Sequence, residues 1–183
     1  MSHTVKRRSF LKGSLAATTA IALPLRAMAA DTLKMGVVLP SPEADVGWSH
    51  TLMEGVRSVQ EAYGDQLEVT VLENIAEGPD GDRIANGLVA EGHNVLLLGS
   101  FGYQNGGIQI AQRRRDVSVI HASGYLTEPN FAPFTAKYWQ GTYLMGMAAA
   151  SLSTSKKIGC VGAFAIPELI TSINAFMLGA QSI

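Results

Sequence analysis

The residues with the most evident chemistry lie in the loop expected at residues 100–107. It presents two aromatic rings and two amides among several glycines: Phe101, Tyr103, Gln104 and Asn105. The loop follows an apolar run at 94–98, typical of a strand buried on both faces of a parallel sheet, and a helix is expected from Ile108. Aromatic faces stack on flat rings and amides both donate and accept hydrogen bonds, so the loop suits a flat, nitrogen-rich small molecule. The alternative is an ordinary turn whose rings cap the core.

A second group of candidate binding residues, Trp48, Ser49 and His50, lies at the start of an expected helix. Trp48 follows a strand-end loop and is the best candidate for stacking, the alternative being a contact that fixes the loop on the helix. Ser49 and His50 could bind polar edges of a ligand, but Ser49 could equally cap the helix. Because ligands bind past the carboxyl ends of parallel strands, we expect Trp48 and Phe101 to face one hollow.

The sequence shows no arrangement of catalytic or metal-binding residues. It contains no GxSxG, Walker, HExxH or CxxC motif, and the glycines near residue 100 do not have GxGxxG spacing. The four histidines, His3, His50, His93 and His121, lack metal-ligand spacing. His121 lies inside an apolar strand and is expected to be a satisfied core residue. We therefore expect no enzyme activity, no cofactor and no metal.

The first 29 residues have the features of an export signal. Residues 6–12 (KRRSFLK) contain a twin-arginine pair, an apolar region follows at 15–25, and Ala27-Met28-Ala29 offers small residues for cleavage after Ala29. The apolar region is too short for a stable membrane span. We expect the twin-arginine translocase to export a soluble periplasmic protein, and the absence of cysteine at the cleavage site predicts no lipid anchor.

The composition limits the remaining classes of function. The chain has 183 residues, 47% of them hydrophobic, which is enough for one domain or slightly more with a sizeable core. Without the signal it has nine basic and 15 acidic residues, a net charge of −6, which argues against nucleic-acid binding. The single cysteine, Cys160, lies in an apolar run and is expected to be a buried small hydrophobic residue.

The elements that must position these residues alternate between strand and helix from residue 33 on. Strands are expected at 33–39, 67–72, 94–98, 117–122 and 134–139, with helices near 49–64, 84–89, 108–113 and 140–152. This alternation predicts a mostly parallel sheet flanked by helices. After a linker at 153–155, a further strand (157–164) and helix (167–180) are expected. They cannot bury their apolar faces alone, so they either finish this sheet or begin a second domain.

Four patches, in this order along the chain, resemble the basic membrane protein family of ABC-transporter substrate-binding proteins. They are DVGWSH with EG at 45–55, LGSFGY at 98–103, QGTYLMG at 140–146, and KIG, IPE and NAF at 157–176. The resemblance covers essentially all of the mature chain, whereas family members are roughly twice as long. It implies a type I periplasmic-binding-protein-like α/β fold with a complete first lobe at 30–155. Residues 156–183 would then be only the first strand and helix of lobe two.

The resemblance also implies a function: the periplasmic solute-binding component of an ABC importer, with an inner-membrane permease as partner. Gly-Trp in the first loop is similar to the branch that binds purine bases, adenine in particular, whereas another branch binds nucleosides. Trp48 and Ser49 fall where the nucleoside branch has a stacking Phe and an Asn, and Ser123 falls where it has an Asp for the ribose. Ribose recognition is therefore in doubt, and a free base or another small heterocycle is favoured.

The same resemblance assigns further ligand positions. Phe101 matches the family's aromatic residue after the third strand, and Asn105 falls where many members have Asp. Glu168 begins an expected helix, where a carboxylate is favourable in any case. As the family's Pro-Glu position in the cleft wall, it could also accept a hydrogen bond from an exocyclic amine. The expected ligand-binding residues are Trp48, Ser49, His50, Phe101, Gly102, Tyr103, Asn105, Ser123 and Glu168.

Two functions of other classes stay open at this stage. Since the twin-arginine route exports folded proteins, the chain could be a periplasmic cofactor enzyme, which predicts a coloured or metal-containing product. It could also be a sensory or scaffold domain that needs no closure around its ligand. That function predicts a gene neighbourhood without permease and ATPase genes.

Overall fold

The structure is a computed structural model of the chain, and it describes residues 32–183. The predicted export signal at 1–29 lies outside the described residues. The strands and α-helices follow each other in this order: β1 (Leu33–Val38), α2 (Trp48–Tyr63), β2 (Leu67–Leu72), α3 (Pro79–Ala90), β3 (Val95–Leu98), α4 (Gln104–Arg113), β4 (Ser118–Ala122), β5 (Phe131–Phe134), α5 (Tyr138–Leu152) and α6 (Pro167–Gln181). Two short 3₁₀ turns lie at Gly64–Gln66 and Phe101–Tyr103.

The five strands form one parallel sheet in the order β2-β1-β3-β4-β5, as the alternation of strands and helices predicted. Strand β1 pairs with β2 from Leu33 opposite Leu67, and with β3 from Met35 opposite Val95. Because all strands run the same way, their carboxyl ends meet at one edge of the sheet. The loops after β1, β3, β4 and β5 therefore lie along that edge.

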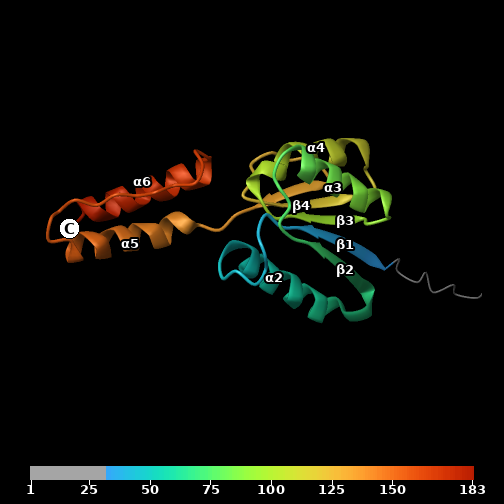
Figure 1. The fold of residues 1–183 in the computed structure, drawn as a ribbon, viewed down its shortest axis with the longest axis horizontal. Coiled ribbons are helices and arrows are strands. Elements are labelled where there is room, and N and C mark those ends of the chain that lie inside the picture. Colours follow the sequence, from blue (N-terminus) through green and yellow to red (C-terminus); the bar gives the residue numbers. More distant parts are fainter. Residues whose placement is uncertain (1–31) are drawn as a thin grey trace, which may run out of the picture. The chain divides into compact units, whose positions relative to one another are not determined.

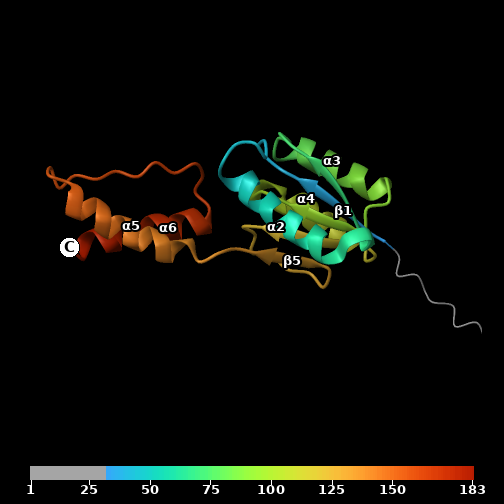
Figure 2. The same cartoon turned by 90° about the horizontal axis from the view of Figure 1, so that it is seen from below.

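Alternate residues of the central strands fill two cores, one on each face of the sheet. Val38, Leu96 and Leu98 pack under α3 and α4, whereas Val37 and Leu97 pack under α2. Figures 1 and 2 show α2 on one face of the sheet, with α3 and α4 on the other. The fold is thus α/β with both faces of the sheet covered, which explains why β3 is a short apolar run.

Helix α4 begins at Gln104, four residues earlier than the sequence predicted. The 3₁₀ turn at Phe101–Tyr103 leads directly into it, so the predicted long loop at 100–107 is wrong. Gly107 lies inside the helix, where a β-carbon would come within 2.6 Å of Leu98 and 2.8 Å of Phe131. This glycine therefore allows α4 to approach the sheet closely, and does not mark a flexible loop.

The fifth strand is Phe131–Phe134, and the prediction at 134–139 is wrong. Its pairing with β4, from Val119 opposite Phe131, ends the ladder at Phe134, and Tyr138 already begins α5. Pro133 fits this assignment because β5 is an edge strand, where a missing N–H is tolerated. The aromatic residues that suggested a strand at 138 and 139 belong to the first turn of a helix.

The predicted strand at 157–164 is also wrong: the structure has no strand there, and every residue from 156 to 165 is exposed. A parallel strand needs a neighbour for its backbone hydrogen bonds, and none of the strands in residues 32–183 lies next to this segment in the ladder. Cys160 is consequently exposed, and the prediction that it is buried is wrong.

Helices α5 and α6 pack against each other along their lengths. The predicted lobe boundary between residues 155 and 156 falls in the connection between these two helices and stays a prediction. Within residues 32–183, no helix has both the length and the apolar character needed to cross a membrane.

Candidate functional site

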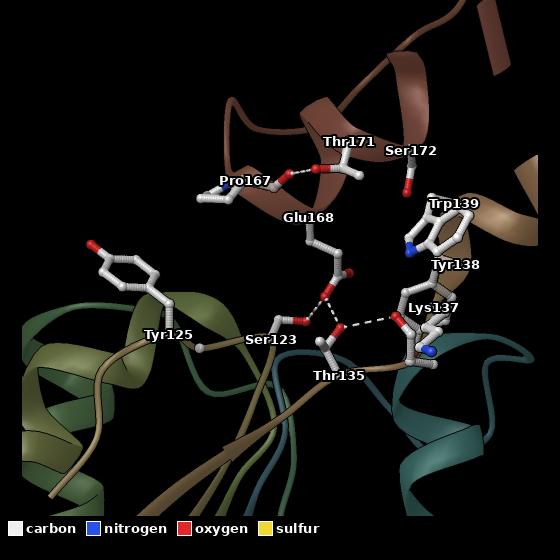
Figure 3. A pocket seen from close by; sticks show the side chains of 12 residues that line it. Ser123, Tyr125, Thr135, Lys137, Tyr138, Trp139, Pro167, Glu168, Thr171 and Ser172 are labelled. Atoms are coloured by element: carbon white, nitrogen blue, oxygen red, sulfur yellow. Dashed lines mark hydrogen bonds between the residues drawn. The ribbon is translucent and has the colours of Figure 1, made fainter. Parts of the chain in front are cut away.

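A hollow of about 430 Å³ lies at the carboxyl edge of the sheet. Its walls come from the turn after β4, the segment from β5 into the first turn of α5, and the first two turns of α6 (Figure 3). The volume lies within the range of about 300–1,000 Å³ that is usual for small-molecule sites. The lining residues are Ser123, Gly124, Tyr125, Thr135, Ala136, Lys137, Tyr138, Trp139, Pro167, Glu168, Thr171 and Ser172.

The carboxylate of Glu168 is the central polar group of the hollow. Its Oε2 accepts a hydrogen bond from the Ser123 hydroxyl at 2.7 Å and from the Thr135 hydroxyl at 2.6 Å, as Figure 3 shows. The two donors follow neighbouring strands, β4 and β5, whereas Glu168 is in the first turn of α6. The structure therefore brings together Ser123 and Glu168, which the sequence had predicted as ligand residues 45 positions apart.

Aromatic side chains flank this carboxylate. Tyr138 and Trp139, the first two residues of α5, are 43% and 44% exposed, and Tyr125 is 62% exposed. Burial and the nearby charge of Glu168 raise the pKa of the Tyr138 phenol, so this group stays a neutral hydrogen-bond donor. Exposed rings beside a carboxylate and two hydroxyls can stack on a flat ligand and bind its polar edge.

Trp48 and Phe101 do not line the hollow, contrary to the expectation that they would face it together. The indole Nε1 of Trp48 donates to the carbonyl of Gly99, which holds the ring against the end of β3. Its centroid lies 6.4 Å from that of Tyr138, and the ring of Phe101 lies 6.1 Å from Tyr125. Each predicted ring thus contacts a tyrosine that does line the hollow.

Ser49 and Tyr103, both predicted as ligand residues, are buried in the structure. Ser49 is 0% exposed and its hydroxyl lies 2.8 Å from that of Ser41. Ser49 does not cap the helix either, because α2 begins at Trp48 and its N-cap residue is Gly47. Tyr103 is 2% exposed, and its hydroxyl donates to the carbonyl of Ile75 at 2.6 Å.

The remaining predicted residues lie near the edge of the sheet but outside the hollow. His50 is half-buried, with Nδ1 3.2 Å from the carbonyl of Glu43. The N–H of Gly102 donates to Glu77 at 3.2 Å, and the hydroxyl of Ser100 donates to the same carboxylate oxygen. Asn105 is exposed on α4.

The turn at 123–125 is held by one buried polar side chain, that of Gln104. Oε1 of Gln104 accepts from the N–H of Tyr125 at 2.9 Å and from that of Leu126 at 3.2 Å. The Gln104 amide, which the sequence suggested as a ligand contact, therefore holds the turn in the structure. Ser123 has a φ of 66°, a left-handed conformation that is uncommon outside glycine and is found at binding sites.

His121 is completely buried beneath this turn, as the sequence predicted, but only one of its two ring nitrogens has a hydrogen-bond partner within residues 32–183. Its Nε2 lies 2.8 Å from the carbonyl oxygen of Ser100, whereas its Nδ1 has no hydrogen-bond partner among the described residues. Burial lowers the pKa of this imidazole, against an opposing effect of the bond to Ser100. His121 is therefore neutral at neutral pH.

Replacement of Tyr103 by phenylalanine is expected to lower the free energy of unfolding by about 1 kcal/mol, because the carbonyl of Ile75 loses its partner. Urea unfolding of both proteins at neutral pH measures this difference.

The stability of the wild type should also depend on pH in the alkaline range because of Tyr103. Burial, and to a smaller extent the charge of Glu77, raises the pKa of Tyr103 from 10.0 to about 12. The unfolded chain therefore loses this proton first, and wild-type stability should fall as the pH rises from 10 towards 12. Urea unfolding across that range checks this. An equal alkaline loss in Tyr103→Phe would contradict the assignment.

Sequence reasoning missed several residues that line the hollow, among them Thr135, Lys137, Tyr138 and Trp139. The available signal was the run TAKYW, polar and aromatic residues next to each other before a helix. Placing the end of the fifth strand at Phe134 would have put this run at the carboxyl edge of the sheet. Because the strand was predicted at 134–139, this run was assigned to the strand and not to the site.

The model for PnrA-like ABC transporter substrate-binding proteins matches residues 32–183. A model for signal sequences of the twin-arginine translocation pathway matches residues 4–24, which confirms the predicted signal. A purine-binding protein of Brucella abortus is 36% identical over 86% of this chain and 45% of its own length. A protein assigned as the glucose-binding protein of an ABC transporter in Haloferax volcanii is 33% identical over 84% of this chain and 39% of its own. The chain thus spans less than half the length of these two relatives.

Solved structures show the same architecture. A solute-binding protein of an ABC transporter system from Aeropyrum pernix matches with a TM-score of 0.71 at 16% identity, over 82% of this chain and 43% of its own. A corresponding protein from Conexibacter woesei matches with a TM-score of 0.61 at 19% identity, over 82% of this chain and 50% of its own. At these identities the likeness shows the fold alone, and it confirms the predicted periplasmic-binding-protein-like α/β class.

Proposed function

Because the chain belongs to the family of PnrA-like ABC transporter substrate-binding proteins, we propose that it binds a purine base, adenine-like in its edge chemistry, for uptake by an ABC importer. The family is one of solute-binding proteins, and we expect no catalytic activity. The family match and the twin-arginine signal identify an exported periplasmic protein.

The observation that carries the proposal is the position of the Glu168 carboxylate between exposed aromatic rings. A purine base is flat, and an exocyclic amine on its edge donates hydrogen bonds. A carboxylate accepts such bonds more strongly than a neutral group does, and Oε2 of Glu168 is already fixed by Ser123 and Thr135. Tyr125, Tyr138 and Trp139 supply the faces on which the base would stack. Stacking on an aromatic side chain contributes about 1–3 kcal/mol per base.

The purine-binding relative supports the same ligand class, whereas the glucose-binding relative favours a second candidate, a sugar. The hydroxyls of Ser123, Thr135, Thr171 and Ser172 would suit a sugar as well as a base. The three exposed aromatic rings of Tyr125, Tyr138 and Trp139 favour a flat ligand. We therefore place the purine base first.

The importer implies a permease in the inner membrane as partner. Closure of a binding protein around its ligand is a shift between two conformations, and the permease would recognise the closed one. A non-transport sensory domain would bind the same ligand without that partner. Genes for a permease and an ATPase beside this one would support transport.

Isothermal titration calorimetry of the mature chain tests the ligand class. We expect adenine to bind with a dissociation constant between about 1 µM and 1 mM, corresponding to roughly −8 to −4 kcal/mol. Guanine, hypoxanthine and adenosine test the edge and ribose preferences, and D-glucose serves as the competing candidate. Heat with glucose and none with any purine would overturn the proposal.

A further inference from the structure

His121 presents a buried acceptor atom to the turn that lines the hollow. Its imidazole is 0% exposed near the end of β4, and Ala122 separates it from residues 123–125, which are called the ligand turn below. The carbonyl of Ser100 can only accept, so Nε2 carries the proton and Nδ1 is left as an acceptor without a partner. Buried polar atoms are nearly always paired in folded proteins, so this exception calls for an explanation.

Gly124 lies directly over that atom. A β-carbon at position 124 would overlap Nδ1 of His121, so only glycine fits there. The same position is 3.1 Å from Oε1 of Gln104, the oxygen that holds the amides of Tyr125 and Leu126. The imidazole nitrogen and the Gln104 oxygen therefore converge beside Gly124.

The groups that contact the His121 imidazole are all uncharged. Ser100 contributes a carbonyl from the end of β3, Phe131 of β5 a ring 5.4 Å away, and Gln104 of α4 a neutral amide beside the ligand turn. Glu77 binds the hydroxyl of Ser100, whose carbonyl contacts the imidazole. Glu168 binds the hydroxyl of Ser123, a residue of the ligand turn.

We propose that His121 is a positioning residue for the ligand turn. In its neutral form it leaves the Gln104 oxygen to hold Tyr125 and Leu126 in place. When protonated it donates to that oxygen and releases the turn. The movement of the turn is inferred from the geometry alone. The consequence, that ligand affinity falls on acidification, also rests on the proposed function.

The direction of the pH effect follows from burial. Because burial lowers the pKa of His121, the imidazole stays neutral at neutral pH and protonates only below the ordinary value of about 6.5. The turn should therefore be in place at neutral pH and be released as the pH falls through that lower value.

Nuclear magnetic resonance of the ligand-free mature chain tests the movement directly. Between pH 7.5 and 4.5, we expect the backbone amides of Gly124, Tyr125 and Leu126 to shift along the same titration curve as the His121 ring, with a midpoint below 6.5. In His121→Gln, which keeps an Nε2 donor for Ser100 but does not titrate, these amides should stay fixed. His93→Gln is the control, since both ring nitrogens of His93 have partners, Leu88 and Thr70, away from the hollow.

Amides of the ligand turn that stay fixed while the His121 ring titrates in the wild type would overturn the proposal, whether or not His121→Gln folds. So would the same titration in His121→Gln. Calorimetry with adenine at pH 7.5 and 5.0 adds the functional consequence: the wild type should lose affinity at pH 5.0, and His121→Gln should not. If adenine fails to bind at both values while the turn titrates, the proposed function fails and the His121 mechanism stands.

Discussion

Replacement of Glu168 by alanine is expected to weaken adenine binding by about 10- to 100-fold, because a hydrogen bond to a charged group contributes about 1.5–3 kcal/mol. The change removes the ligand's acceptor and also leaves the hydroxyls of Ser123 and Thr135 without their common partner. Glu168→Gln keeps an acceptor oxygen without the charge, so its loss should be intermediate. Calorimetry at pH 7.5 measures all three proteins.

Glu61→Ala is the matched control for this series. It removes a carboxylate from an exposed position on α2, outside the hollow. Because surface substitutions of this kind have small effects, the affinity for adenine should stay within about twofold of the wild-type value. If Glu168→Ala binds adenine as tightly as Glu61→Ala does, the carboxylate is not part of the site.

The second large effect concerns the packing of α5 on α6. A methyl group on Gly146 would overlap the backbone carbonyl of Phe176, and one on Gly179 would overlap that of Tyr143, so the helices touch through their glycines. Backbone atoms cannot turn aside as a side chain can. Gly146→Ala should therefore force the helices apart and destabilise their pairing by about 1–3 kcal/mol.

Gly141→Ala in the same helix provides the comparison. A β-carbon at 141 meets nothing within 4 Å, so this change should stabilise α5 by up to about 1 kcal/mol through helix propensity. Hydrogen exchange of the amides in α5 measures both variants, with faster exchange expected in Gly146→Ala and slower exchange in Gly141→Ala. Equal protection in the two variants would contradict the close contact.

The parallel sheet was predictable from the sequence because its signal is local. Each of the runs at 33–39, 67–72 and 95–98 is bounded by glycine, proline or polar residues, and helices with apolar periodicity separate them. What the sequence did not define was where the last strand stops. That depends on pairing with β4, and a run such as FTAKYW satisfies strand and helix preferences equally well.

The proximity of two predicted site residues has a different origin. Ser123 and Glu168 were identified through the family resemblance, and the structure joins them by a hydrogen bond. Ser49 and Tyr103 are buried, which the sequence did not reveal, since the type of a polar or aromatic side chain does not show whether it faces the core. Trp48 and Phe101 are at the expected edge, but their rings contact Tyr138 and Tyr125 and neither lines the hollow. Side-chain direction at a turn depends on tertiary contacts that one sequence does not reveal.

The most direct test of the account is the crystal structure of the mature protein with adenine. We predict that the base lies in the hollow, with its amine on the second carboxylate oxygen of Glu168 and its ring against Tyr138 or Trp139. Adenine bound elsewhere on the chain, with the contacts of Glu168 to Ser123 and Thr135 unchanged and the hollow empty of base, would contradict it.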